Sequence, residues 1–175
     1  RENRYWWPMI AAIRFLALTG LRKGEALSLR WSYVNLATGS LDLPESKTGA
    51  KVVPLGAPAV ELLAGLPRMA NNDHVFPGLK PGRPIASLTD PWFDLRKRAR
   101  LDGVRLHDLR HSFASVGAGG GMSLVVIGSL LGHRQAQTTS RYAHLAEDPR
   151  KAAADRIANR VNPTLRLHGK TMKSG

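Results

Sequence analysis

Apolar residues recur at helical spacing along most of this chain, and that periodicity limits which fold it can adopt. Ile10, Ile13 and Leu16 are three residues apart, and Leu109 and Phe113 are four apart. Such spacing places apolar side chains on one face of a helix. With the Gly and Pro residues that interrupt it, the pattern predicts helices over residues 5–18, 22–30, 58–66, 91–101, 106–118, 122–131, 138–145 and 149–161.

One segment departs from the helical pattern. Residues 33–36, 40–43 and 51–55 are short and partly alternating, and turn-forming residues separate them. They predict a small antiparallel sheet of about three strands near the N-terminal side. Residues 67–91 are rich in Pro, Gly, Asn and Asp, which is typical of an irregular loop. The predicted fold class is therefore mainly α (α+β), a helical domain with one small sheet.

The length of 175 residues suits one domain. We expect this domain at residues 1–161, followed by a basic, flexible tail at 162–175. The longest apolar run, Met9–Leu18, contains Arg14 and falls short of the roughly 18 residues that span a bilayer. There is no cysteine, which fits a reducing cytoplasm. Because the chain does not begin with Met, we expect a fragment of a longer protein.

The net charge points to a polyanionic partner. Twenty-six Lys and Arg residues oppose 13 Asp and Glu residues, which gives +13 at pH 7. Phosphate neutralisation by such side chains dominates nucleic-acid affinity. A basic solvated surface or a membrane-surface binder would carry a similar charge, but no basic amphipathic helix with an aromatic face stands out. An RNA-binding protein also fits the charge alone.

Two pairs of residues are candidates for holding a phosphate. Arg22 opens a predicted helix, and Glu25 lies one turn further on, where it can orient the guanidinium. At this spacing an Arg–Glu pair is also a common surface salt bridge. His107 and Arg110 share one face of another helix start, where the helix dipole favours anions.

The segment around His107 has a second interpretation. His107-Asp108-Leu109-Arg110-His111 resembles the zinc-binding pattern H-E-x-x-H. Asp108 is one methylene shorter than the glutamate of that pattern, no third ligand is obvious, and Arg110 would lie close to a dication. The sequence therefore favours a site without metal or other cofactor.

Two further candidates follow near the C-terminal end. His133 comes just after Gly132, where a helix is expected to end, and Tyr142 lies on the next predicted helix. Taken alone, a single tyrosine is most simply a half-buried packing residue with a satisfied hydroxyl.

Four segments together carry a family resemblance. They are "TGLRKGEALSLRW" (19–31), "SKTGAKVVPL" (46–55), "HDLRHSFAS" (107–115) and "LLGHRQAQTTSRYAH" (130–144). In this order and spacing, the chain resembles the catalytic domain of the tyrosine recombinase (phage integrase) family from about Thr19 to Leu145. The run of glycines at 119–121 is richer than is usual in that family. Members of that family carry an N-terminal helical core-binding domain, and we expect it to be missing from this chain.

The resemblance implies an enzyme that cuts and rejoins DNA strands through a 3′-phosphotyrosyl intermediate, without metal or ATP. It makes Tyr142 the nucleophile and Lys47 the acid for the leaving 5′-oxygen, with His107 helping to accept the tyrosine proton. It makes Glu25 a supporting residue. It gives the contacts to the phosphate oxygens to Arg22, Arg110 and His133.

The same resemblance implies the partners and setting. We expect duplex DNA with a specific recombination site, and self-association on DNA through residues 149–161. A bacterial, cytoplasmic protein associated with the nucleoid, of prophage or similar origin, is expected. Two other functions stay open at this point: a type IB topoisomerase-like relaxing enzyme, and a catalytically silent DNA-binding prophage remnant.

Overall fold

A computed structural model describes residues 7–44, 49–133, 137–145, 154 and 157–159. Its elements are α1 (Trp7–Thr19), α2 (Lys23–Leu27), η1 (Trp31–Tyr33), β1 (Val34–Asn35), β2 (Ser40–Leu43), β3 (Lys51–Pro54), α3 (Ala57–Ala64), α4 (Thr89–Arg98), α5 (Asp108–Gly119), α6 (Leu124–Leu131), α7 (Gln137–Ser140) and η2 (Ala143–Leu145). The prediction of a mainly helical chain with one small sheet is confirmed.

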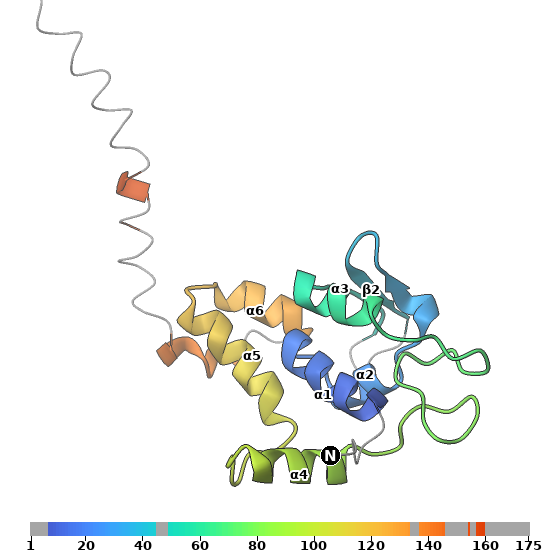
Figure 1. Cartoon of the computed structure of the whole chain (residues 1–175). Helices are drawn as coiled ribbons and strands as arrows, with labels where there is room; N and C mark the ends of the chain where they lie inside the picture. Colours follow the sequence, from blue (N-terminus) through green and yellow to red (C-terminus); the bar gives the residue numbers. More distant parts are fainter. Residues whose placement is uncertain (1–6, 45–48, 134–136, 146–153, 155–156, 160–175) are drawn as a thin grey trace, which may run out of the picture.

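Helix α1 runs through the middle of the molecule, with α2, α3, α4 and α5 packed around it (Figure 1). Ala11 and Ala12 are small and buried, so neighbouring helices can approach the α1 backbone closely. Phe15 is fully buried and lies against Phe76, with ring centroids 5.5 Å apart. The helix ends where Gly20 adopts a φ of 63°. This helix forms the centre of the larger hydrophobic core.

The sheet has the strand order β1-β2-β3, and both strand pairs are antiparallel. Leu41 lies opposite Val34 on one side and Val53 on the other. Leu41, Leu43 and Val53 are buried, whereas Asp42 between the two leucines is exposed. This alternation is what a sheet with one buried face requires. Residues 45–48, which include Lys47, lie outside the described part of the β2–β3 connection.

The segment predicted to be an irregular loop is irregular in the structure, and it also contributes to the hydrophobic core. Between α3 and α4 the chain forms only isolated bridges, such as Pro77 with Pro84. Val75 and Phe76 of this loop are completely buried. The backbone N–H of Val75 donates to the carbonyl of Leu29 at 2.9 Å, which ties the loop to the segment just after α2.

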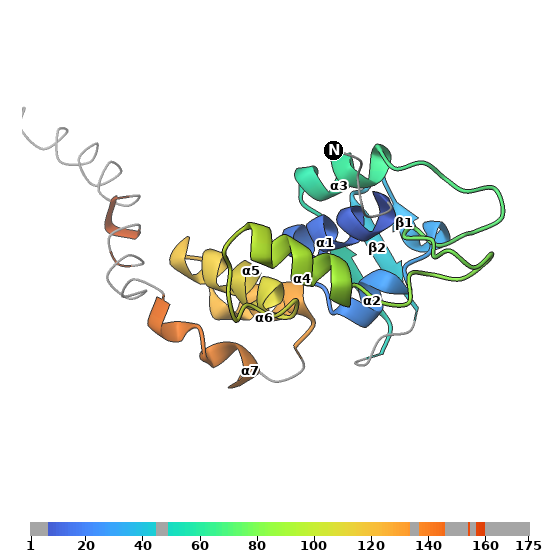
Figure 2. The same cartoon turned by 60° about the horizontal axis from the view of Figure 1, so that its bottom comes forward.

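A smaller core joins α5, α6 and the segment after α7 (Figure 2). Ala114 and Ala118 of α5 pack with Ile127 and Leu131 of α6, and Tyr142 completes the cluster. The predicted C-terminal glycine of α6 is confirmed, because Gly132 has a φ of 65° in the left-handed region.

The structure departs from the prediction around Tyr142. One helix was expected over 138–145, but α7 ends at Ser140 and a 3₁₀ turn follows from Ala143. Thr138 and Thr139 are poor helix formers, and Ser140 bonds its hydroxyl to the Gln137 carbonyl at 2.7 Å. Tyr142 therefore lies in the turn between two short pieces.

Most of the helix predicted over 149–161 lies outside the described residues. Ala154 and residues 157–159 are helical, and the Ile157 side chain is 65% exposed. The tail at 162–175 also lies outside them. None of the described helices is both long enough and apolar enough to cross a membrane.

Candidate active site

Glu25 holds two cations at the start of α2. Arg22 is the N-cap residue, and its backbone N–H and its Nη1 donate to the two carboxylate oxygens at 3.2 Å and 3.0 Å. Lys51, the first residue of β3, donates from Nζ to Glu25 Oε1 at 2.8 Å. Burial raises the pKa of Glu25, but the hydrogen bonds from Lys51 and Arg22 outweigh burial and lower that pKa overall. Glu25 is therefore ionised at pH 7 and fixes both cations.

Arg110 is buried and joins three parts of the chain. Its Nη1 donates to the carbonyl of Gly20 at 2.6 Å, and its Nη2 donates to the carbonyl of Leu131 at 2.7 Å. Burial, followed by the charge of Arg22, lowers the pKa of Arg110 to about 10. The guanidinium still carries its charge at pH 7, so it places a fixed positive charge at a buried position.

Two glycines make the close approach of these elements possible. Gly20 has a φ of 63°, and a Cβ there would lie 2.7 Å from Phe113 Cδ1. Gly132 has a φ of 65°, and a Cβ there would lie 2.9 Å from Lys51 Nζ. Arg22 Nη2 also approaches the Gly132 carbonyl at 3.5 Å. Because a Cβ strains this left-handed conformation, both positions favour glycine.

His133 follows Gly132 and is held by α7. Its Nδ1 lies 2.8 Å from the hydroxyl of Thr139, a side chain that is 1% exposed. Burial lowers the pKa of His133 to about 4, and the charges of Arg110 and Arg22 contribute to this shift. The imidazole is thus neutral at pH 7 and lies within the field of both arginines.

Tyr142 points its hydroxyl at a histidine that the sequence did not assign to the site. His111 Nδ1 lies 2.7 Å from Tyr142 Oη, and Tyr142 is only 6% exposed. Burial raises the pKa of Tyr142, although the charges of Arg141 and Arg110 act in the opposite direction. The phenol is therefore protonated at neutral pH in this structure.

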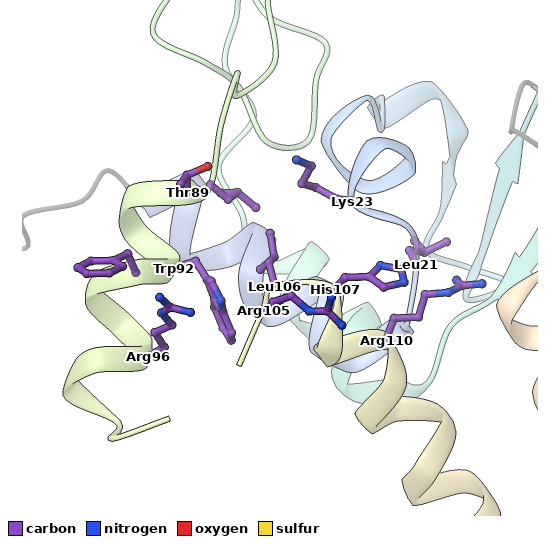
Figure 3. Close-up of a pocket in the computed structure, with 11 residues that line it drawn as sticks. Leu21, Lys23, Thr89, Trp92, Arg96, Arg105, Leu106, His107 and Arg110 are labelled. Atoms are coloured by element: carbon purple, nitrogen blue, oxygen red, sulfur yellow. The ribbon is translucent and has the colours of Figure 1, made fainter. Parts of the chain in front are cut away.

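His107 also packs against His111. The two rings meet edge to face with centroids 5.0 Å apart. His107 lines a cavity of about 400 Å³ with Leu21 and Arg110, and Figure 3 shows its ring beside both side chains. Burial lowers the pKa of His107, as do the charges of His111 and Arg110.

The structure thus gathers most of the predicted site. Lys47 lies outside the described residues. Lys51 and His111 were missing from the predicted site. His111 was visible in the motif "HDLRH", whereas nothing in the sequence pairs Lys51 with Glu25. The other predicted residues meet where the start of α2, the start of α5, the end of α6 and the turn after α7 come together: Arg22, Glu25, His107, Arg110, His133 and Tyr142.

This arrangement suits an anion beside a hydroxyl nucleophile. The guanidinium groups of Arg22 and Arg110 and the imidazoles of His107 and His133 supply N–H donors. These donors match the oxygens of a phosphodiester. Among the described residues, no three His, Cys, Asp or Glu side chains are grouped so as to hold a metal ion.

The phage integrase family pattern matches residues 7–148, so this chain belongs to the phage integrase family. It is similar to the shufflon-specific DNA recombinase of Escherichia coli, with 34% identity over 157 residues that cover 83% of this chain and 38% of that protein. It is also similar to tyrosine recombinase XerD of Pseudomonas putida, with 33% identity over 153 residues, 78% of this chain and 49% of XerD. The chain therefore spans about half or less of the length of these relatives.

Solved structures show the same fold. The catalytic domain of bacteriophage HP1 integrase aligns with a TM-score of 0.62 and 27% identity, covering 83% of this chain and 79% of that domain. XerH site-specific recombinase bound to palindromic difH substrate, a post-cleavage complex, aligns with a TM-score of 0.67 and 25% identity, covering 83% of this chain and 44% of XerH. The expected tyrosine recombinase catalytic-domain fold is confirmed.

Proposed function

We propose that this chain is the catalytic part of a site-specific DNA recombinase or integrase that cuts and rejoins strands through Tyr142. One observation carries the proposal: buried Tyr142 packs in one cluster with Leu131, and the Leu131 carbonyl holds the Arg110 guanidinium at 2.7 Å. Arg22 and His133 belong to the same electrostatic cluster. A nucleophile next to fixed cations is what attack on a phosphodiester requires.

The proposed reaction uses one covalent intermediate. Tyr142 Oη attacks a DNA phosphorus, the bond from phosphorus to O5′ breaks, and a 3′-phosphotyrosyl link remains. Arg22, Arg110 and His133 donate to the non-bridging oxygens, where negative charge increases in the transition state. Lys47 protonates the leaving O5′. Attack by a 5′-hydroxyl reverses these steps, and because the phosphotyrosine conserves the bond energy, no ATP is needed.

Duplex DNA is the proposed substrate. The chain carries a net charge of +13, and its structural relative XerH was solved bound to a DNA site. We further propose that the natural target is one specific recombination site on bacterial or prophage DNA in the cytoplasm. The relatives named above are recombinases and integrases, which favours recombination over relaxation of supercoils.

The proposed assembly extends beyond this domain. We place the catalytic domain at residues 1–161 and a basic tail at 162–175. A core-binding domain of the family kind would close the other half of a clamp on the DNA. We propose that residues 149–161 dock on a neighbouring copy, and the exposed Ile157 side chain supplies apolar surface for such a contact.

A covalent-trapping experiment tests the proposed activity. The gene product containing this chain is mixed with a library of nicked duplexes whose sequence is randomised around the nick. Because of the nick, the short fragment that cleavage releases diffuses away. Complexes that survive denaturation are recovered and sequenced. The parent should form such a complex in excess EDTA, and Tyr142→Phe should form none. No complex from the parent would refute the enzyme assignment.

A further inference from the structure

His111 is the one charged or polar partner of the Tyr142 hydroxyl that the structure describes, and the roles above give it nothing to do. It lies on α5 one turn after His107. Its Nδ1 is 2.7 Å from Tyr142 Oη, a distance at which a proton can pass between the two atoms. The tyrosine ring is tilted by 47° to the imidazole, with centroids 6.2 Å apart.

The Tyr142 hydroxyl has particular need of a proton acceptor. The residue is 6% exposed, so bulk water has little access to it. Burial raises the pKa of its phenol, which keeps the proton in place at neutral pH. Arg141 and Arg110 favour the phenolate by their charge, but an arginine cannot take the proton.

His107 is less well placed for this task. Its described ring contact is with His111, edge to face, with centroids 5.0 Å apart. It also lines the cavity shared with Leu21 and Arg110 (Figure 3). His111 therefore contacts both the nucleophile and His107.

We propose that His111 is the group that accepts the tyrosine proton, an inference that rests on the proposed strand cleavage. As the bond from Tyr142 Oη to phosphorus forms and the bond from phosphorus to O5′ breaks, the proton of Oη moves to His111 Nδ1. O5′ takes its proton from the separate acid proposed above. In the reverse reaction His111 returns the proton to Oη, so atoms and charges balance over the cycle.

The groups around His111 are consistent with this role. On α5, His107 and Asp108 interact with it electrostatically. From the end of α6, His133 does the same. From the turn after α7, the Tyr142 hydroxyl makes the direct contact. An imidazolium formed at His111 would have the carboxylate of Asp108 nearby, and the negative DNA phosphate would add to its stabilisation.

Replacing His111 with asparagine separates proton transfer from positioning. The asparagine amide can occupy the place of Nδ1 and keep a hydrogen bond to Oη, but it cannot hold a proton. With a nicked duplex recovered from the library, His111→Asn should form the covalent complex about 100-fold more slowly than the parent, at unchanged DNA affinity. His144→Asn, an exposed histidine two residues after Tyr142, is the matched control and should match the parent.

A more acidic tyrosine provides the decisive readout. A fluorinated tyrosine placed at residue 142 alone loses its proton more easily than tyrosine does. In the His111→Asn variant it should therefore raise the rate of covalent complex formation at least tenfold. It should restore nothing if His111 only positions the ring. The two rates compared, with tyrosine and with fluorinated tyrosine, are both measured in the same variant, so a general folding defect cannot imitate the rescue. His111→Gln serves as a second variant.

Two results would overturn the inference while leaving the proposed function intact. One is a His111→Asn rate within about threefold of an active parent. The other is a slow variant that the fluorinated tyrosine does not rescue. A parent that forms no complex at all would overturn the proposed function and this inference together.

Discussion

At the residue scale, Glu25 shows how one carboxylate can organise several cations. It accepts hydrogen bonds from the backbone and side chain of Arg22 and from Lys51, and the sequence disclosed only the first partner. Arg22 is three residues away and therefore recognisable as a helical neighbour. Lys51 is 26 residues away, so its position beside Glu25 depends on how β3 lies relative to α2.

Replacing Glu25 with glutamine should lower the free energy of unfolding by about 2 kcal/mol at pH 7, because two cations lose a charged acceptor. The pKa of Glu25 is lowered in the folded state, so its contribution is full above its ordinary value of 4.5 and is lost as the pH falls further. Urea unfolding at pH 7 and at acid pH should show that the difference in free energy of unfolding between parent and variant becomes smaller on acidification. Equal stability at pH 7 would contradict the account.

Thr139 fixes the ring of His133 through a hydroxyl that is almost completely buried. Thr139→Val keeps the shape and removes the hydrogen bond, worth about 1 kcal/mol, so the rate of covalent complex formation should fall roughly five- to tenfold. Thr138→Val, on the same helix, is the control. The rate is measured at saturating DNA. An unchanged rate would mean that the contact with Thr139 does not position His133.

At the element scale, the sequence predicted those features that depend on neighbours along the chain. The helical periodicity of α1, the turn between β1 and β2 and the C-terminal glycine of α6 are all local signals, and all three agree with the structure. The break between α7 and η2 was missed, because no Gly or Pro marks it in the sequence. The contact between His111 and Tyr142 spans 31 residues, so its geometry could not be derived from local sequence.

Gly20 offers a test of how the C-terminal end of α1 packs against α5. Gly20→Ala would strain a positive φ and press against Phe113, which should cost about 2–4 kcal/mol of folding free energy. It should also slow cleavage, because the Gly20 carbonyl holds Arg110. Gly24→Ala is the matched control: it has open space around it within α2 and should gain up to about 1 kcal/mol. Thermal unfolding of both variants checks the prediction, and equal effects would contradict it.

At the scale of the whole molecule, the charge of +13 should make DNA binding strongly dependent on salt. A surface that neutralises six to ten phosphates loses about 10³–10⁵ in affinity between 50 and 200 mM salt. Titration of a duplex of unrelated sequence, by fluorescence anisotropy, should show a loss in this range. A salt-matched RNA duplex should bind more weakly. Affinity that is independent of salt, or a preference for RNA, would contradict duplex DNA as the partner.

The central claim is that Tyr142 forms a covalent bond to a DNA 3′-phosphate, and mass spectrometry of the trapped complex tests it most directly. After nuclease and protease digestion, the account predicts a nucleotide attached to the peptide that contains Tyr142, with a free 5′-hydroxyl on the released strand. A nucleotide attached to Tyr5 or Tyr33, or a 5′-phosphate on the released strand, would contradict it.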